Sequence, residues 1–320
     1  MSLFRYCLVV VAHALALSAA HAQTPIPSQI TIVVPFGAGA SNDSIARVIA
    51  PELAKRLNTN VIVENKAGAA GTIGSAYVAK SPKDGATLLL SSSTFVTSAA
   101  TQPKIPYDAL RDFTPVAMVG QGPLVIAVSG NDSYQTLPEV LGAAKQSPGT
   151  LNYGSSGIGS LAHLATTLLN DAAEVNITHV PYKGAAAAAA DLAGGRIQLM
   201  IANYSSLASL LEGEKVRLVA TTAPGPHDAF PKLAPAAAAV PGFEVDIWVG
   251  LFAPAGTPKD LIERYNEVLN EINRSPRLTE LLKLDGTAPA ALSSDEFAQR
   301  VTQDLQRWQA VANEHGIEVN

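Results

Sequence analysis

The chain has 320 residues, of which 48% are hydrophobic and 15% are charged, a composition that excludes an intrinsically disordered protein. There are 22 Lys and Arg residues against 27 Asp and Glu residues. The resulting net charge of −5 argues against nucleic acid as the main partner, because phosphate binding needs clustered basic residues. The single cysteine, Cys7, excludes a disulfide framework or a cysteine-based metal site within the chain.

The N-terminal 22 residues have the pattern of a secretory signal peptide. Arg5 precedes an apolar stretch at 7–20, and Ala20-His21-Ala22 is typical of a cleavage site. The apolar stretch is shorter than the roughly 18 to 20 residues that span a membrane. We therefore expect a signal peptide at 1–22, cleavage near Ala22, and a periplasmic mature chain without cysteine.

Beyond residue 22, short β-rich segments alternate with segments of helical periodicity. We expect strands at 30–35, 61–63, 87–90, 124–128, 151–153, 177–180, 197–201 and 216–221. We expect helices at 45–57, 136–146, 161–169 and 185–192. This alternation is typical of βαβ units and predicts an α/β fold with a mostly parallel sheet. The simplest architecture is two α/β lobes with a cleft between them.

The C-terminal part is more helical. Thr257 followed by Pro258 predicts a helix N-terminus, with Thr257 as the N-cap and a buried stripe from Leu261 to Ile272. Ser293 and Glu296 have the spacing of a capping box, which predicts the start of a last helix.

Two loops rich in small residues follow strands, one in each predicted lobe, at 35–43 and 153–160. Such loops lie at the carboxyl ends of parallel strands, where α/β proteins bind ligands. The helix N-terminus after each loop offers unpaired N–H groups to an anion, and serines add hydroxyl donors. Each loop alone also fits an ordinary turn whose Ser and Asn cap a helix. The pair, facing across a cleft, favours a site that grips both ends of a dicarboxylate.

Several more specific motifs, for cofactor binding or catalysis, are incomplete. Gly157-x-Gly159 lacks the acidic residue of a dinucleotide site after the next strand, and Ile158 replaces the last glycine of a G-x-S-x-G serine hydrolase motif. The four histidines beyond the signal peptide lack metal-ligand spacing, so we expect no metal and no cofactor. His163 and Lys183 could face the cleft and Asp43 could bind an ammonium group, but each also fits an ordinary structural or solvated role.

Five segments resemble the Bug receptors, the periplasmic substrate-binding proteins of tripartite tricarboxylate transporters. They are IVVPF at 32–36, VENKAG at 63–68, LNYGSSG at 151–157, HVPYKG at 179–184 and FAPAGTP at 252–258. The resemblance runs from about Pro27 to Ile317. It implies a two-lobed type II periplasmic-binding-protein fold with a central ligand cleft and crossover strands between the lobes. We expect lobe 1 at 23–125 and 244–320, lobe 2 at 126–243, and crossovers near 124–128 and 243–249.

The resemblance also implies ligand-binding positions. They are Phe36, Gly39, Ala40, Ser41, Asn42 and Asp43 in the first loop, Ser93 and Thr94 after the third strand, Ser155, Ser156, Gly157, Gly159 and Ser160 in the second loop, and Gly184, Ala185 and Asn203. One departure is that Ala38-Gly39-Ala40 stands where the family commonly has Pro-Gly-Gly. The methyl group of Ala40 restricts φ and narrows the site.

The resemblance implies a receptor that captures a mono-, di- or tricarboxylate and delivers it to an integral-membrane permease. We expect a monomer that is not an enzyme. The alternatives are a secreted hydrolase that uses Ser155 or Ser156, or a ligand sensor for a signalling partner. A hydrolase needs a base within hydrogen-bond reach of its nucleophile, and no recognised motif places a histidine near either serine.

Overall fold

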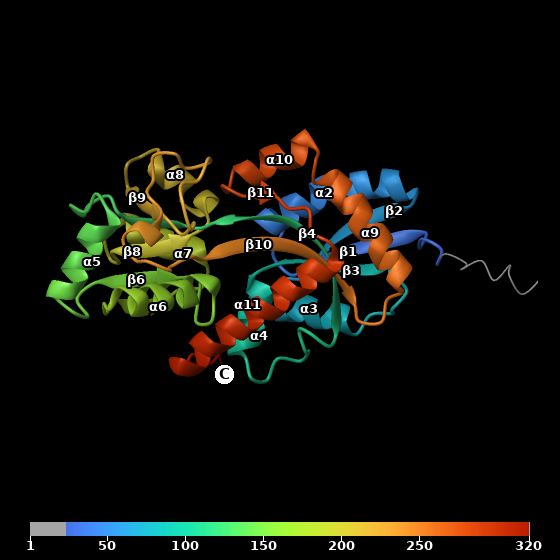
Figure 1. Ribbon diagram of the computed structural model, residues 1–320, viewed down its shortest axis with the longest axis horizontal. Coiled ribbons are helices and arrows are strands. Elements are labelled where there is room, and N and C mark those ends of the chain that lie inside the picture. The colour runs from blue at the N-terminus through green and yellow to red at the C-terminus, as the bar shows by residue number, and fades with distance from the viewer. Residues whose placement is uncertain (1–23, 320) are drawn as a thin grey trace, which may run out of the picture.

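The computed structural model describes residues 24–319 and contains two β-sheets (Figure 1). The predicted signal peptide at 1–22 lies outside the described residues. The first sheet has the strand order β11-β4-β10-β3-β1-β2, with bounds Ala288–Pro289, Phe113–Pro123, Asp246–Pro254, Thr87–Ser92, Gln29–Val34 and Asn60–Asn65. The second has the order β7-β6-β8-β5-β9, with bounds Thr178–Pro181, Asn152–Ser155, Leu199–Ala202, Val125–Ser129 and Val216–Thr221.

Helices cover both faces of the first sheet. One face carries α2 (Ser41–Leu57), α9 (Lys259–Ile272) and α10 (Pro276–Lys283). The other face carries α3 (Thr72–Ala79), α4 (Thr94–Thr101) and α11 (Ser294–Glu314). Around the second sheet lie α5 (Leu137–Gln146), α6 (Leu161–Ala173), α7 (Ala185–Ala193) and α8 (Ala208–Leu211). Within residues 24–319, no helix is long and apolar enough to cross a membrane.

Each sheet is mixed, so the prediction of a mostly parallel sheet is wrong. β1 pairs parallel with β2 and β3, and β6 pairs parallel with β7 and β8. β10, β4 and β11 run antiparallel in the first sheet, and β5 runs antiparallel to β8 and β9 in the second. β4 and β5 carry the chain from the first sheet to the second, β9 and β10 flank its return, and β11 adds a short edge strand. Local periodicity does not reveal such long-range pairing.

The chain passes between the sheets twice, and the two passages lie side by side. β4 and β10 pair antiparallel from Asp246 opposite Pro123 to Pro254 opposite Phe113. β4 continues through Leu124 directly into β5, and the return passage runs from 222 to 245 before β10. Leu124 and Val245 fall within the predicted crossover segments, whereas the exact lobe boundaries stay a prediction.

Thr222 ties the two passages together. Its side chain is fully buried, and its Oγ1 accepts a hydrogen bond from the N–H of Leu124 at 2.8 Å and donates one to the carbonyl of Val245. The N–H of Val245 in turn donates to the carbonyl of Thr222 at 3.1 Å. One threonine therefore fixes the register of both passages at the point where the chain changes sheets.

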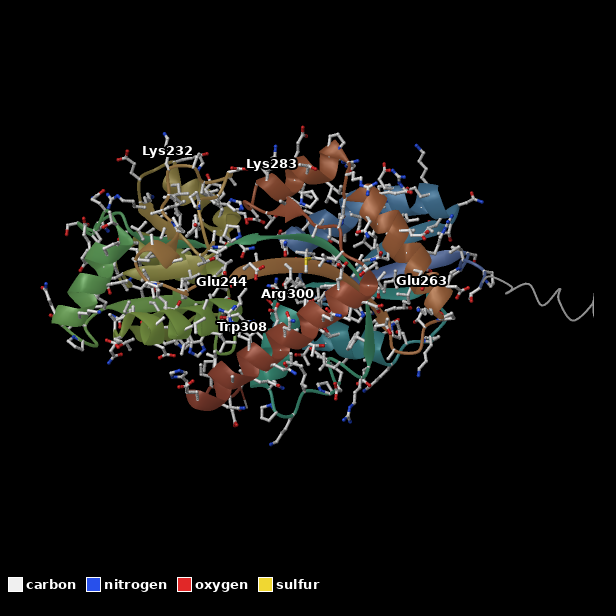
Figure 2. The ribbon with its side chains drawn as sticks, viewed as in Figure 1. Lys232, Glu244, Glu263, Lys283, Arg300 and Trp308 are labelled. Carbon is white, nitrogen blue, oxygen red and sulfur yellow. The ribbon has the colours of Figure 1, made fainter. Side chains whose placement is uncertain are left out.

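A hydrogen bond and ion pairs join helix α11 to β10. The indole N–H of Trp248 donates to Asp304 at 2.7 Å, and Arg300 pairs with both Asp246 and Asp304. Figure 2 labels Arg300 on the part of α11 nearer to this strand and Trp308 farther along the helix. The helix starts at the predicted capping box, which is confirmed: Ser293 accepts from the N–H of Glu296 and Glu296 accepts from the N–H of Ser293.

The predicted N-cap of α9 is wrong. Helix α9 begins at Lys259 with Pro258 as its N-cap residue, and the Thr257 hydroxyl donates to the carbonyl of Pro254 instead. Asp260, in the first turn, accepts from the N–H and the hydroxyl of Thr24. These bonds hold the start of the described chain against α9 and lower the pKa of Asp260.

We predict that Thr222→Val destabilises the protein by about 1–3 kcal/mol, because valine keeps the shape but leaves a buried N–H and a buried carbonyl unpaired. Thr221→Val is the matched control, since Thr221 Oγ1 is buried without a hydrogen-bond partner among the described residues. Urea unfolding measures both. An equal free energy of unfolding for the two variants would show that Thr222 is not a structural tie.

Candidate functional site

Two cavities lie in the cleft between the sheets. The inner cavity has a volume of about 90 Å³ and is lined by Thr94, Leu124, Ser156, Leu161, Ala162, Ala185, Met200, Ile201, Ala202, Asn203, Ser206 and Ile247. The outer cavity has a volume of about 380 Å³ and is lined by Gly39, Ala40, Ser41, Ser44, Ile45, Ser205, Ser206, Leu281, Leu282, Leu284, Asp285 and Thr287. Ser206 lines both, so the two cavities are neighbours along one cleft.

The first predicted loop presents its backbone to the outer cavity. Gly39, Ala40 and Ser41 line the cavity, and Ala40 is the N-cap residue of α2 without a side-chain cap. The first N–H groups of this helix are therefore not covered by a capping side chain, and the positive end of its dipole faces the cleft.

Asp43 organises the first loop from behind. Its carboxylate is buried and accepts hydrogen bonds from the N–H of Gly39 at 2.9 Å, Nε of Arg47 at 3.0 Å and Nδ2 of Asn65 at 2.9 Å. The Arg47 hydrogen bond in particular lowers the pKa of Asp43 to about 2, against the opposing effect of burial. Asp43 therefore holds the loop as a carboxylate, and it lines neither cavity.

The second predicted loop divides its two serines between different tasks. Ser156 is exposed and lines the inner cavity. Ser155 is fully buried, and its hydroxyl lies 2.6 Å from Nε2 of His179, 3.0 Å from the carbonyl of Gly157 and 3.1 Å from the N–H of Gly157. Ser155 thus holds the shape of the loop, while Ser156 is the serine that a ligand can reach.

A histidine lies beside Ser155, although no recognised sequence motif places it there. His179 comes from β7, which pairs with β6, and this long-range register brings the ring to Ser155. Ser155 is inaccessible to a substrate, and no carboxylate partner of the His179 ring is found within residues 24–319. The pair has the distance of a nucleophile and its base but not the exposure that catalysis requires.

A second histidine stacks on the first. The rings of His163 and His179 lie 3.8 Å apart between centroids, and the ring of Tyr153 lies 4.9 Å from that of His179. Burial lowers the pKa of both histidines to about 4, and for His163 the neighbouring His179 and His315 add to the effect. Nδ1 of His163 accepts from the N–H of Gly159, so the uncharged stack supports the second loop.

Glycines shape the second loop. Gly157 and Gly159 have φ values of 133° and 75°, a region that other residues rarely adopt. A Cβ at Gly159 would lie 2.3 Å from Oγ1 of Thr101, so only glycine permits this contact between the lobes. Ser160 then caps α6 by accepting from the N–H of His163. Gly157, Gly159 and Ser160 line neither the inner nor the outer cavity.

The remaining predicted residues fall in two groups. Thr94, Ala185 and Asn203 line the inner cavity, and Gly184 directly precedes Ala185 as the N-cap residue of α7, with no side-chain cap. Phe36, Asn42 and Ser93 line neither cavity. Ser93 is buried and accepts from the N–H of Trp248 at 2.9 Å, so it positions a crossover strand. Lys183 is exposed and also lies outside both cavities.

Several residues that line the cleft were not predicted from the sequence. Ser205 and Ser206 come from the 3₁₀ turn Tyr204–Ser206 after β8, and Asp285 comes from the loop after α10. Leu124 and Ile247 come from the crossover passages. A polar turn at the end of a strand was the one available signal, at 203–206. The others are brought to the cleft only by the pairing of distant segments.

The inner cavity offers donors without a formal charge. Thr94, Ser156, Asn203 and Ser206 supply hydroxyl or amide groups, and α7 supplies an uncapped N-terminus. No Lys or Arg in the described part of the chain lines this cavity. Such a set can bind a carboxylate through hydrogen bonds and the helix dipole alone. Within residues 24–319, no group of three or more His, Cys, Asp or Glu residues could hold a metal ion.

A larger cavity of about 620 Å³ lies elsewhere, between the crossover passages and α11. It is lined by Thr222, Glu244, Asp246, Arg300 and Asp304, among others, and contains none of the predicted site residues. Arg300 is already paired with Asp246 and Asp304. His227 and Arg307 also line it, so its lining mixes acidic and basic groups.

Known proteins resemble the chain over nearly its whole length. Residues 45–317 match the family described as "Tripartite tricarboxylate transporter family receptor". A UPF0065 protein from the tcbD–tcbE intergenic region of Pseudomonas sp. strain P51 is 36% identical over 99% of this chain and 96% of its own length. BugT of Bordetella pertussis is 33% identical over 91% of this chain and 90% of its own.

Two solved structures with bound ligands also resemble it. Rpa4515 of R. palustris, solved with adipate, has a TM-score of 0.81 and 33% identity over 91% of this chain and 98% of its own. MatC of Rhodopseudomonas palustris, solved with malate, has a TM-score of 0.77 and 30% identity over 88% of this chain and 98% of its own.

The histidine stack makes stability depend on pH. The unfolded chain binds protons at His163 and His179 near the ordinary pKa of 6.5, whereas the folded chain does so only near 4. We therefore predict that the free energy of unfolding falls as the pH is lowered from about 6.5 to about 4. Urea unfolding across this range measures it.

His179→Asn should flatten that pH dependence, and His227→Asn, away from the stack, should leave it unchanged. A steep pH dependence that survives in a variant lacking both stacked histidines would assign the effect to other groups.

Proposed function

The chain belongs to the tripartite tricarboxylate transporter receptor family, and from this premise we propose that it captures a small carboxylate in its cleft and delivers it to an integral-membrane permease. The Bug resemblance of the sequence is confirmed. The two-lobed α/β fold is that of periplasmic binding proteins, and the family consists of receptors, not enzymes.

One observation carries the proposal. The inner cavity is lined from both lobes, by Thr94 and Ile247 on one side and by Ser156, Ala185 and Asn203 on the other. A ligand there touches both lobes at once, so its binding energy can favour the closed arrangement over an open one. Donors without a countercharge suit an anion, in keeping with the adipate and malate bound by two similar proteins.

The buried Ser155–His179 pair does not favour the hydrolase alternative, because no substrate can reach the serine. A sensing role uses the same closed state as transport. We propose the permease partner because of the family to which the chain belongs. We also propose that the protein is a monomer and that it is exported to the periplasm. Cleavage near Ala22 is proposed as well, at a residue outside the described part of the chain.

We predict that Ser156→Ala weakens carboxylate binding by about tenfold or more, since a hydrogen bond to a charged group contributes about 1.5–3 kcal/mol. Ser156→Asp should weaken it further, because it places a negative charge near a negative ligand. Lys183→Ala should have a smaller effect, because an exposed ammonium group is screened by water and salt.

Titration calorimetry on the chain from Gln23 onward measures these affinities, after a thermal-shift screen of carboxylates has identified a ligand. Ser155→Ala is the contrasting variant: it should lower the melting temperature, because the buried His179 and Gly157 lose their partner, whereas Ser156→Ala should not. If Lys183→Ala abolishes binding while both Ser156 variants bind normally, the site is centred on a cation and the proposal is wrong.

A further inference from the structure

Asp285 joins the two lobes at the outer cavity. Its Oδ2 accepts a hydrogen bond from the hydroxyl of Ser41 at 3.0 Å, and its Oδ1 accepts one from the N–H of Ser205 at 2.9 Å. Ser41 is the first residue of α2, beside the first sheet, and Ser205 follows β8 of the second sheet. A single carboxylate of the protein therefore bridges the two sides of the cleft.

The loop that carries Asp285 extends from the first lobe toward the second. It follows α10, whose last residue Lys283 is labelled in Figure 2 at the end nearer the second lobe. Gly286 has a φ of 67°, and a Cβ there would lie 2.3 Å from Cε2 of Phe230, which belongs to the passage between β9 and β10. Only glycine allows this close contact, which sets Asp285 beside Ser205.

The bridging carboxylate occupies a position that attracts anions. It lies at the uncapped N-terminus of α2, where the helix dipole favours negative charge. It already accepts the hydrogen bond that the Ser41 hydroxyl donates. Among the residues that the structure describes, no Lys or Arg lines the outer cavity. A second anion arriving there would meet the Asp285 carboxylate without a compensating cation.

The cleft leads a ligand toward this position. Ser206 lines both cavities, so a ligand whose carboxylate is held in the inner cavity extends its other end past Ser206 toward Asp285. An uncharged group or a hydrogen-bond donor at that end fits beside the Asp285 carboxylate. A second carboxylate is repelled by it or must displace it from Ser41 and Ser205.

We propose that Asp285 bridges the lobes at the outer end of the cleft and thereby selects ligands with one carboxylate over ligands with two. This inference rests on the proposed function and adds the residue that sets its specificity. Asp285 acts as an internal carboxylate that takes the outer anion position. It also limits how far the lobes separate at this end of the cleft when no ligand is bound.

The selectivity is tested with acids of equal length that differ by one carboxylate: butanoate and succinate, pentanoate and glutarate, hexanoate and adipate. Calorimetry should show that the wild-type protein favours the monocarboxylate of each pair that binds. Asp285→Asn should shift the affinity ratio toward the dicarboxylate by about tenfold, since it removes one close like charge. Glu280→Gln, an equal charge change on exposed α10, should leave the ratio unchanged.

A purely structural role for Asp285 would weaken both acids equally, and an unchanged ratio would overturn the proposal. So would a wild-type preference for the dicarboxylate of every pair.

The bridge is tested without any ligand. The chain beyond the predicted signal peptide contains no cysteine, so Lys145→Cys and Glu267→Cys place one spin label on each lobe at exposed helix positions. Asp285→Ala should lengthen the distance between the labels in the unliganded protein, and Glu280→Ala should not. If no carboxylate binds the wild-type protein, the proposed function fails, and Asp285 is judged on this distance alone. An unchanged distance overturns the bridge.

Discussion

The antiparallel pairing of β4 with β10, tied at Thr222, is the constraint on which the rest of the structure depends. Both passages between the sheets lie side by side and share one buried threonine, so the chain itself crosses between the two lobes at one place. The strand-to-helix loops of the two lobes line different parts of the cleft: the first loop lines the outer cavity, and Ser156 of the second loop lines the inner cavity. Rotation about such a connection changes the width of the cleft and little else, which is the hinge motion expected of a binding protein.

Behind each predicted ligand loop, hydrogen bonds to one buried side chain hold the loop in place: Asp43 in the first loop and Ser155 in the second. Asp43 with Arg47 and Asn65 holds the first loop, and Ser155 with His179 holds the second. These side chains do not line the cleft. Their contribution to binding is preorganisation, because donors that are already in place do not lose conformational entropy when a ligand binds. A buried residue in a binding loop can therefore matter without touching the ligand.

The sequence predicted what local patterns determine. β-rich runs marked most strands, the Ser293–Glu296 box marked the start of α11, and two small-residue loops pointed to the cleft. The strands β4 and β10 were not predicted: β4 carries Gly120, Gly122 and Pro123, which disfavour a strand prediction, and it forms because β10 pairs with it. The contact between Ser155 and His179, 24 residues apart, depends on the register of two strands, and Asp285 reaches Ser41 across 244 residues. Such contacts follow from tertiary structure, which no local spacing encodes.

The central claim is that a small carboxylate closes the two lobes about the β4–β10 connection. The most direct test is small-angle scattering of the chain from Gln23 onward, with and without a carboxylate whose saturating binding has been shown by calorimetry. The account predicts a smaller radius of gyration in the saturated protein. An identical radius in both states, with full occupancy of the ligand, would contradict it.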